Sequence, residues 1–136
     1  MKIVSIVSTL ALFCLVQVSC KKPPVIEGHQ FPKGPRKVQF VLYTEQDFSH
    51  DNHVIVFSMS IQNESHHSIW DSTLAPMKIK DIPGIEHKLI FTKTINHNAS
   101  VLKTGFFYAI DNVGRSWHLE AFPAGDTLKL VDFNFR

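Results

Sequence analysis

Histidines and acidic residues gather in one short polar stretch that could bind a metal ion. His50 and His53 lie within a few residues of Asp47 and Asp51. A zinc site needs three or four converging ligands, and His50, Asp51 and His53 could supply them only if the loop folded around the ion. A calcium ion would use oxygens of Asp47, Asp51 and Asn52, but the glycine and the regularly spaced acidic residues of an EF-hand loop are missing. We therefore expect a solvated loop without a bound metal.

A third zinc ligand would have to come from the next loop, which contains His66 and His67. Residues 53–63, between the two loops, read as a single strand. About 11 residues rising about 3.3 Å each span about 36 Å, which places the two loops at opposite ends of that strand. The sequence therefore predicts no metal and no cofactor in the mature domain.

The sequence also lacks the motifs of covalent catalysis. It contains no Gly-x-Ser-x-Gly motif, no glycine-rich phosphate loop and no cysteine after residue 20. Glu45, Asp47, Asp71, Glu120 and Asp126 follow no pattern that would pair two carboxylates in a cleft for glycoside chemistry. We therefore expect a non-enzymatic protein, and the alternative is a hydrolase or metal-dependent enzyme whose site spans several loops.

Two tryptophans are the remaining candidates for a functional role. Exposed Trp and Tyr side chains can stack on sugars or anchor a protein partner. Trp117 opens an apolar alternating run, so we expect it in the core. Trp70 lies among Ser68, Asp71 and Ser72, and its sequence context favours core and surface equally.

The composition predicts one small domain with a packed core. Of 136 residues, 44% are hydrophobic and 19% are charged, which argues against disorder along the whole chain. Lys and Arg number 14 and Asp and Glu number 12. This near balance argues against a nucleic-acid-binding protein, which usually has a basic face. Eleven Phe residues favour β structure, because aromatic side chains suit a pleated surface.

Apolar and polar residues alternate through most of residues 38–136. A period of two is typical of strands with one buried face. A further strand is expected over residues 75–82, at a sheet edge because Pro76 and Pro83 flank it. The aromatic residues expected to be buried are Phe40, Phe57, Phe91, Tyr108, Trp117 and Phe133.

Short turns separate the alternating runs. Residues 112–115 and 123–126 join strong runs, so the last three strands are expected to form consecutive hairpins. Gly105 and Gly114 are expected to mark a bulge and a turn. About six to eight short strands predict an all-β domain, a single antiparallel two-sheet sandwich of Ig-like or transthyretin-like type. A closed barrel is the alternative.

The first 19 residues read as a signal peptide. Lys2 supplies a positive charge and residues 3–18 are mostly apolar. This run of about 16 residues is short for a transmembrane helix, which needs about 20, and it fits the apolar region of a signal peptide. Residues 20–37 are rich in proline and basic residues and are expected to form an extended tether. Residues 38–136 remain as the folded domain.

The end of the apolar run, Val18-Ser19-Cys20, resembles the lipobox of bacterial lipoproteins. Gln17 departs from the pattern, in which leucine is usual. The resemblance implies cleavage before Cys20 and a diacylglycerol, with acyl chains such as palmitate, on its thiol. The alternative is an ordinary secretory signal that leaves Cys20 as a free thiol. The other cysteine, Cys14, lies in the expected signal peptide, so the mature domain is expected to have no disulfide.

The chain as a whole resembles small lipoproteins of Bacteroidota, a resemblance that brings no activity with it. Ser19-Cys20-Lys21-Lys22 and segments 40–48, 70–72, 111–117 and 131–135 carry it. It implies a membrane-anchored lipoprotein whose small domain has a binding or structural role in the cell envelope. The expected partners are membrane lipid through Cys20 and an envelope protein or a glycan, with no nucleic acid. Because no acidic run like that of surface-export signals follows Cys20, the expected location is the periplasmic face of the outer membrane.

Overall fold

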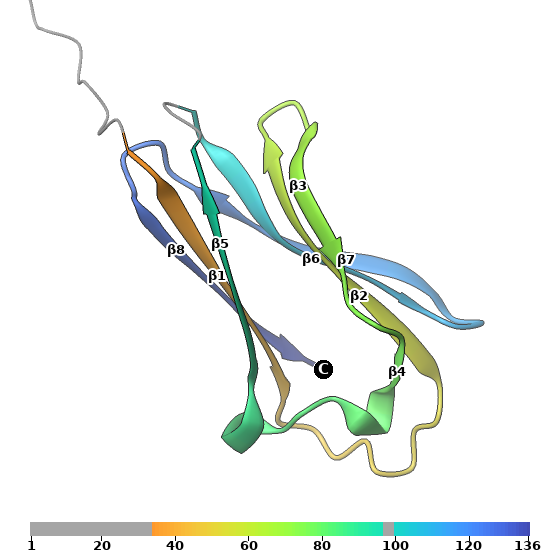
Figure 1. Ribbon diagram of the computed structural model, residues 1–136. Coiled ribbons are helices and arrows are strands. Elements are labelled where there is room, and N and C mark those ends of the chain that lie inside the picture. The colour runs from red at the N-terminus through yellow and green to blue at the C-terminus, as the bar shows by residue number, and fades with distance from the viewer. Residues whose placement is uncertain (1–33, 97–99) are drawn as a thin grey trace, which may run out of the picture.

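Two β-sheets pack face to face in the computed structural model, which describes residues 34–96 and 100–136 (Figure 1). The all-β, two-sheet sandwich expected from the alternating sequence is therefore confirmed. The expected signal peptide, Cys20 and most of the expected tether lie outside the described residues. Within the described ranges, no helix is long and apolar enough to cross a membrane.

Eight strands and two short 3₁₀ helices make up the described part of the chain. One sheet has the strand order β5-β1-β8, and the other has the order β3-β2-β6-β7 with β4 paired to β2. The strand expected over residues 75–82 is shorter, because the chain turns into η1 after Lys78. The elements are β1 (Arg36–Thr44), β2 (Val54–Asn63), β3 (Ser68–Thr73), β4 (Met77–Lys78), η1 (Ile79–Asp81), η2 (Ile85–His87), β5 (Leu89–Ile95), β6 (Leu102–Ile110), β7 (Gly114–Phe122) and β8 (Leu128–Phe135).

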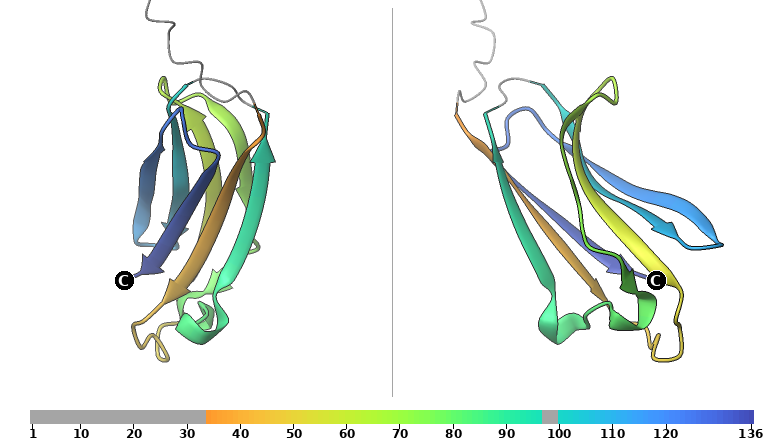
Figure 2. Two further views of the ribbon diagram at one scale, coloured as in Figure 1. Left: turned by 90° about the vertical axis from the view of Figure 1, so that its left-hand side faces the viewer. Right: turned by 45° about the vertical axis from the view of Figure 1, so that its right-hand side comes forward.

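Strand β8 crosses to the other sheet instead of continuing the β6–β7 hairpin (Figure 2). β6 and β7 form the expected hairpin, but β8 pairs with β1, and this pair is parallel. The expectation of consecutive hairpins is therefore wrong for the last strand, and the sandwich departs from an all-antiparallel arrangement at this pair. The physical reason is the loop after β7, which takes the chain over the end of the sandwich and is held there by Arg36.

The core lies between the sheets and is built from the alternating faces that the sequence predicted. Phe40 and Phe57 are completely buried. Phe91, Tyr108 and Phe133 are half-buried and pack against the core. The rings of Phe57 and Phe133 meet edge to face with centroids 6.4 Å apart, an arrangement that aromatic pairs favour. The expected burial is thus complete for two of these residues and partial for three.

Trp117 contradicts its expected burial, because 67% of its surface is exposed. The alternation in β7 was predicted but its phase was wrong. His118, the next residue, stacks on Phe133 of the opposite sheet with ring centroids 5.1 Å apart, so His118 lies on the inner face. Trp117 pairs with Phe107 of β6 on the outer face. An apolar row of β7 therefore faces solvent.

The two predicted glycine roles have different outcomes. Gly114 has a φ of 147° and follows the hairpin turn, as expected of a residue that adopts positive φ without strain. The pairing of β6 with β7 runs without a register shift through Gly105, so the expected bulge is wrong. A glycine is required at position 105 because the backbone of β7 approaches it closely.

Charged side chains of the edge strands close the two long sides of the sandwich. On the β3–β5 side, Lys93 Nζ lies 5.3 Å from the ring centroid of Trp70, and the Trp70 and Phe40 centroids are 5.8 Å apart. Trp70 is therefore half-buried beside the core. On the β7–β8 side, Lys129 Nζ lies 2.5 Å from a carboxylate oxygen of Glu120. Inward-pointing charges of this kind hinder an edge strand from pairing with another chain.

The first strand begins at Arg36, although the tether was expected to continue to residue 37. Arg36 is only 3% exposed. Its guanidinium donates hydrogen bonds to the backbone carbonyls of Ser100, Phe122, Pro123 and Asp126 and lies 3.8 Å from the centroid of the Phe122 ring. Burial lowers the pKa of Arg36 against an opposing effect of Asp126. This one side chain joins the start of β1 to the loop before β6 and to the crossover into β8.

Candidate functional site

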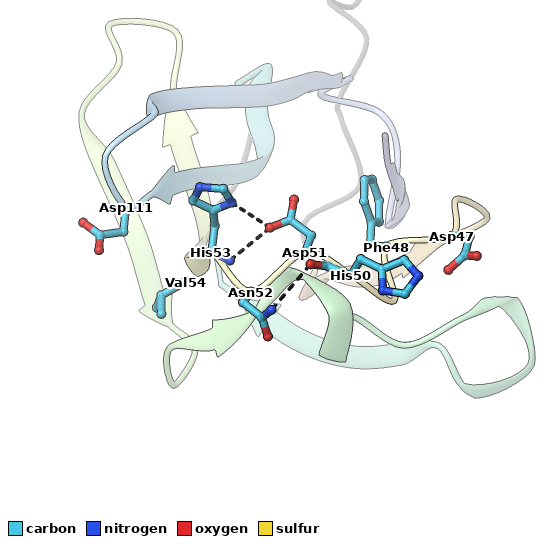
Figure 3. A pocket seen from close by; sticks show the side chains of 8 residues that line it. All are labelled: Asp47, Phe48, His50, Asp51, Asn52, His53, Val54 and Asp111. Carbon is cyan, nitrogen blue, oxygen red and sulfur yellow. Dashed lines mark hydrogen bonds and ion pairs between the residues drawn. The ribbon is translucent and has the colours of Figure 1, made fainter.

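The loop rich in acidic residues and histidines lies at one end of the sandwich (Figure 3). Asp47, His50, Asp51, His53 and Asp111 are among the residues that line a hollow there. Asp51 Oδ1 accepts a hydrogen bond from the backbone N–H of His53 over 3.0 Å and lies 2.7 Å from Nδ1 of the same residue. Figure 3 shows Asp47 in the loop and Asp111 in the β6–β7 turn on opposite sides of this pair. The carboxylates therefore do not converge.

Hydrogen bonds within the loop lower the pKa of both of its aspartates. For Asp51 the backbone N–H of His53 has the largest effect, followed by the His53 ring. For Asp47 the backbone N–H and then the side chain of Ser49 have this effect. Bonds from an aspartate to the backbone two residues later stabilise turns, so these carboxylates hold the loop in shape.

No group of three or more His, Cys, Asp or Glu side chains converges in residues 34–96 and 100–136. His66 and His67 lie in the turn between β2 and β3, whereas His50 and His53 lie before β2. The length of β2 separates the two loops (Figure 1), as the sequence predicted. The structure therefore does not supply the third zinc ligand from His66 or His67, and the absence of a metal stays a prediction.

A small ionic network crosses between the sheets on the β7–β8 side. Glu120 accepts a hydrogen bond from Lys129, and its Oε1 lies 3.0 Å from His118 Nε2. Burial raises the pKa of Glu120, but the hydrogen bonds and charges of Lys129 and His118 outweigh burial and lower the pKa. A carboxylate whose pKa is lowered in the folded protein stabilises the fold at any pH above its unfolded-state pKa. This stability is lost as the pH falls through the folded-state pKa. The network therefore has a structural role between the edge strands.

The outer face of β2, β6 and β7 carries the second candidate site. Two hollows meet on this face and share Val56, Ala109 and Arg115 in their linings. The first has a volume of about 420 Å³ and is also lined by Phe107 and Trp117. The second has a volume of about 680 Å³ and continues to the turn of the β6–β7 hairpin. We call the two hollows together the Trp117 groove.

The Trp117 groove combines an aromatic platform with polar groups. Trp117 and Phe107 occupy paired positions on β7 and β6, and the linings also contain Ser58, Ser116 and Arg115. The side chains that line the two hollows include a single carboxylate, that of Asp111, and no histidine or cysteine. An exposed indole beside hydroxyl groups and a cation can stack on a ligand and hydrogen-bond to it. The groove is therefore suited to binding.

No family model, curated protein or solved structure matches this chain. The assignment of the site therefore rests on geometry and chemistry.

The sequence contains a feature that points to the Trp117 groove and that the period of two alone does not identify. Strand β6 reads Gly-Phe-Phe-Tyr-Ala-Ile over residues 105–110 and is apolar on both faces. Phe106 and Tyr108 pack into the core, while Phe107 and Ala109 line the groove. A strand that is apolar on both faces is typical of sheets covered on both sides. Here the described residues cover only one side.

Proposed function

We propose that this protein is a lipid-anchored, non-enzymatic binding module of the bacterial cell envelope that captures its ligand in the Trp117 groove. The observation that carries the binding role is the 67% exposure of Trp117 on the outer face of the edge strand β7. Burying a large aromatic side chain is favourable by about 1.5–3 kcal/mol. Exposed tryptophans beside a groove are therefore frequent binding anchors.

The lipobox-like Val18-Ser19-Cys20 supports the anchor. About 15 residues separate Cys20 from Arg36 and, fully extended, would span at most about 50 Å. A lipid on Cys20 would thus hold the domain near the membrane and leave the groove free to meet other envelope components. We place the module on the periplasmic face of the outer membrane.

Replacement of Cys20 by serine tests the anchor. The mature wild-type protein is expected to begin at Cys20, to carry a diacylglycerol mass on its N-terminal peptide and to remain in the membrane fraction. The Cys20→Ser variant is expected to move to the soluble fraction, because the thiol that carries the lipid is gone. Mass spectrometry and cell fractionation measure both outcomes. An unmodified Cys20, or a mature start elsewhere, would contradict the anchor.

A photo-crosslinking amino acid in place of Trp117 tests the binding surface in native cells. A benzophenone side chain at this position is expected to form a discrete adduct on irradiation, because it lies where the ligand binds. The control carries the same side chain in place of Leu128, which is 60% exposed and lies in the other sheet. Adducts of equal yield at both positions, or none at position 117, would argue against the Trp117 groove as a binding surface.

A further inference from the structure

We propose that the ligand of the Trp117 groove is an acidic polysaccharide, with a sugar ring stacked on Trp117 and its carboxylate paired with Arg115. This inference rests on the proposed binding function and assigns its ligand class. It is carried by the open shape of the groove, by its aromatic platform and by the position and free charge of Arg115.

The shape of the groove suits an extended chain better than a small enclosed ligand. The two hollows adjoin along β6 and the start of β7, from Trp117 to the hairpin turn, and share Val56 and Ala109 between them. Figure 2 shows the hairpin reaching away from the three-stranded sheet, which leaves this face accessible. A chain of sugar rings can lie along such a surface with its apolar ring faces against the indole.

The charge in the groove selects for an anionic ligand. Arg115 is exposed, and its side chain forms no hydrogen bond or ion pair with the described parts of the chain. The hollow next to Trp117 has no carboxylate in its lining. Arg115 and Asp111 both line the second hollow, towards the hairpin turn, but they form no ion pair with each other. The guanidinium beside Trp117 therefore has no ion-pair partner among the described residues.

The spacing of the two side chains matches one sugar ring. Arg115 and Trp117 are two residues apart on the same strand, so they share a face and lie about 6.6 Å apart along it. A pyranose ring stacked on Trp117 covers most of that distance, which brings a ring carboxylate next to the guanidinium. Guanidinium groups bind carboxylates through paired, charge-assisted hydrogen bonds. The groove is thus complementary to a uronic acid unit.

Binding of polygalacturonate by the full-length lipidated protein in phosphatidylcholine nanodiscs tests this inference. The matched probe is the fully methyl-esterified polymer, which has the same rings without the charge. We expect polygalacturonate to bind at least about tenfold more tightly than the ester. The ester lacks one charge-assisted hydrogen bond to Arg115, and the loss of such a bond has about this effect on affinity. Isothermal titration calorimetry at fixed, moderate ionic strength measures both affinities, because ion pairing on the surface is screened by salt.

Three variants test which residues contribute to the affinity for polygalacturonate. Arg115→Gln is expected to weaken polygalacturonate binding about tenfold and to leave binding of the ester unchanged. Trp117→Ala is expected to weaken binding of both polymers, because the stacking platform is lost. Lys80→Gln removes an exposed charge in η1 that does not line the Trp117 groove; it is the control and is expected to match the wild type.

The outcomes separate this inference from the proposed function. Equal binding of the acid and the ester, or no binding of either polymer, overturns the acidic-polysaccharide ligand. If the adduct at position 117 in native cells is then a protein, the binding function stands with a different partner. Binding to phosphatidylglycerol vesicles alone, lost in Trp117→Ala, overturns the polysaccharide in favour of a lipid surface. Polygalacturonate binding that Trp117→Ala leaves unchanged overturns the assignment to the groove.

Discussion

Replacement of Arg36 by alanine is expected to lower the free energy of unfolding by about 3–5 kcal/mol, because four backbone carbonyls lose their hydrogen-bond donor. The guanidinium donates to four backbone carbonyls, over 2.6 Å to Pro123 and 2.9–3.1 Å to Ser100, Phe122 and Asp126. Each buried polar group that loses its partner costs about 1–3 kcal/mol. A domain of this size has only about 5–15 kcal/mol in total, so the variant is expected to be close to unfolding.

Lysine at this position separates the charge of Arg36 from its shape. Arg36→Lys keeps the charge but replaces a planar fork of five donors by a single ammonium group. We expect the free energy of unfolding of Arg36→Lys to lie between that of the wild type and that of Arg36→Ala, because the ammonium group cannot reach all four carbonyls. Urea denaturation followed by circular dichroism measures these free energies.

Arg115→Ala is the matched control for Arg36→Ala. Arg115 is exposed and its side chain forms no hydrogen bond with the described residues, so the loss of that side chain is expected to change stability by less than about 0.5 kcal/mol. A loss below about 1 kcal/mol in Arg36→Ala would contradict the structural role of Arg36, and equal losses in the two alanine variants would do the same.

The alternation of apolar residues was sufficient to predict the sandwich and most of its core. In β1, β2 and β8, the phenylalanines lie on the inner face, as Phe40, Phe57 and Phe133 show. Because the side-chain period of a strand is two, the buried face of each follows directly from the sequence. These strands hold the core together and need no information about distant partners.

The same rule failed in β7, where Trp117 lies on the outer face although Phe122 is buried in the core. The inner face carries His118 and Glu120, which contact each other, and Glu120 is also paired with Lys129 of β8. That partner belongs to another sheet and is not visible in the sequence of β7 alone. Local rules are expected to fail where function requires it, and the outer face of β7 is where the Trp117 groove lies.

The crossover of β8 and the role of Arg36 could not be predicted either. Short polar turns normally join neighbouring antiparallel strands, so residues 123–126 favoured a hairpin. The loop instead packs on Arg36, which comes from the other end of the chain, 87 residues away from Pro123. An arginine after a proline-rich segment reads as part of a solvated tether. Only tertiary contacts identify it as buried.

A tertiary contact also makes Gly105 of β6 necessary, because the backbone of β7 lies close to it. Strand β6 also carries Phe107 of the Trp117 groove. A Cβ added at Gly105 would lie 1.8 Å from the carbonyl oxygen of His118 and 2.9 Å from Cα of Leu119. Both atoms belong to the backbone of β7, so no side-chain rotation relieves the overlap. The β6–β7 pairing continues in register through this position, and a methyl group there must push the two strands apart.

We therefore expect Gly105→Ala to lower the free energy of unfolding by about 3 kcal/mol or more, the upper end of what overpacking costs. Gly125→Ala is the matched control, because a Cβ at Gly125 meets no atom within 4 Å. Its stability is expected to stay within about 1 kcal/mol of the wild type, with a small gain from the stiffer unfolded chain. Urea denaturation of the two variants under identical conditions measures the difference. Equal stabilities would show that β6 and β7 do not approach as closely as the structure indicates. A selective loss in Gly105→Ala would establish that this approach, and with it the position of Trp117 opposite Phe107, depends on the absence of a single side chain.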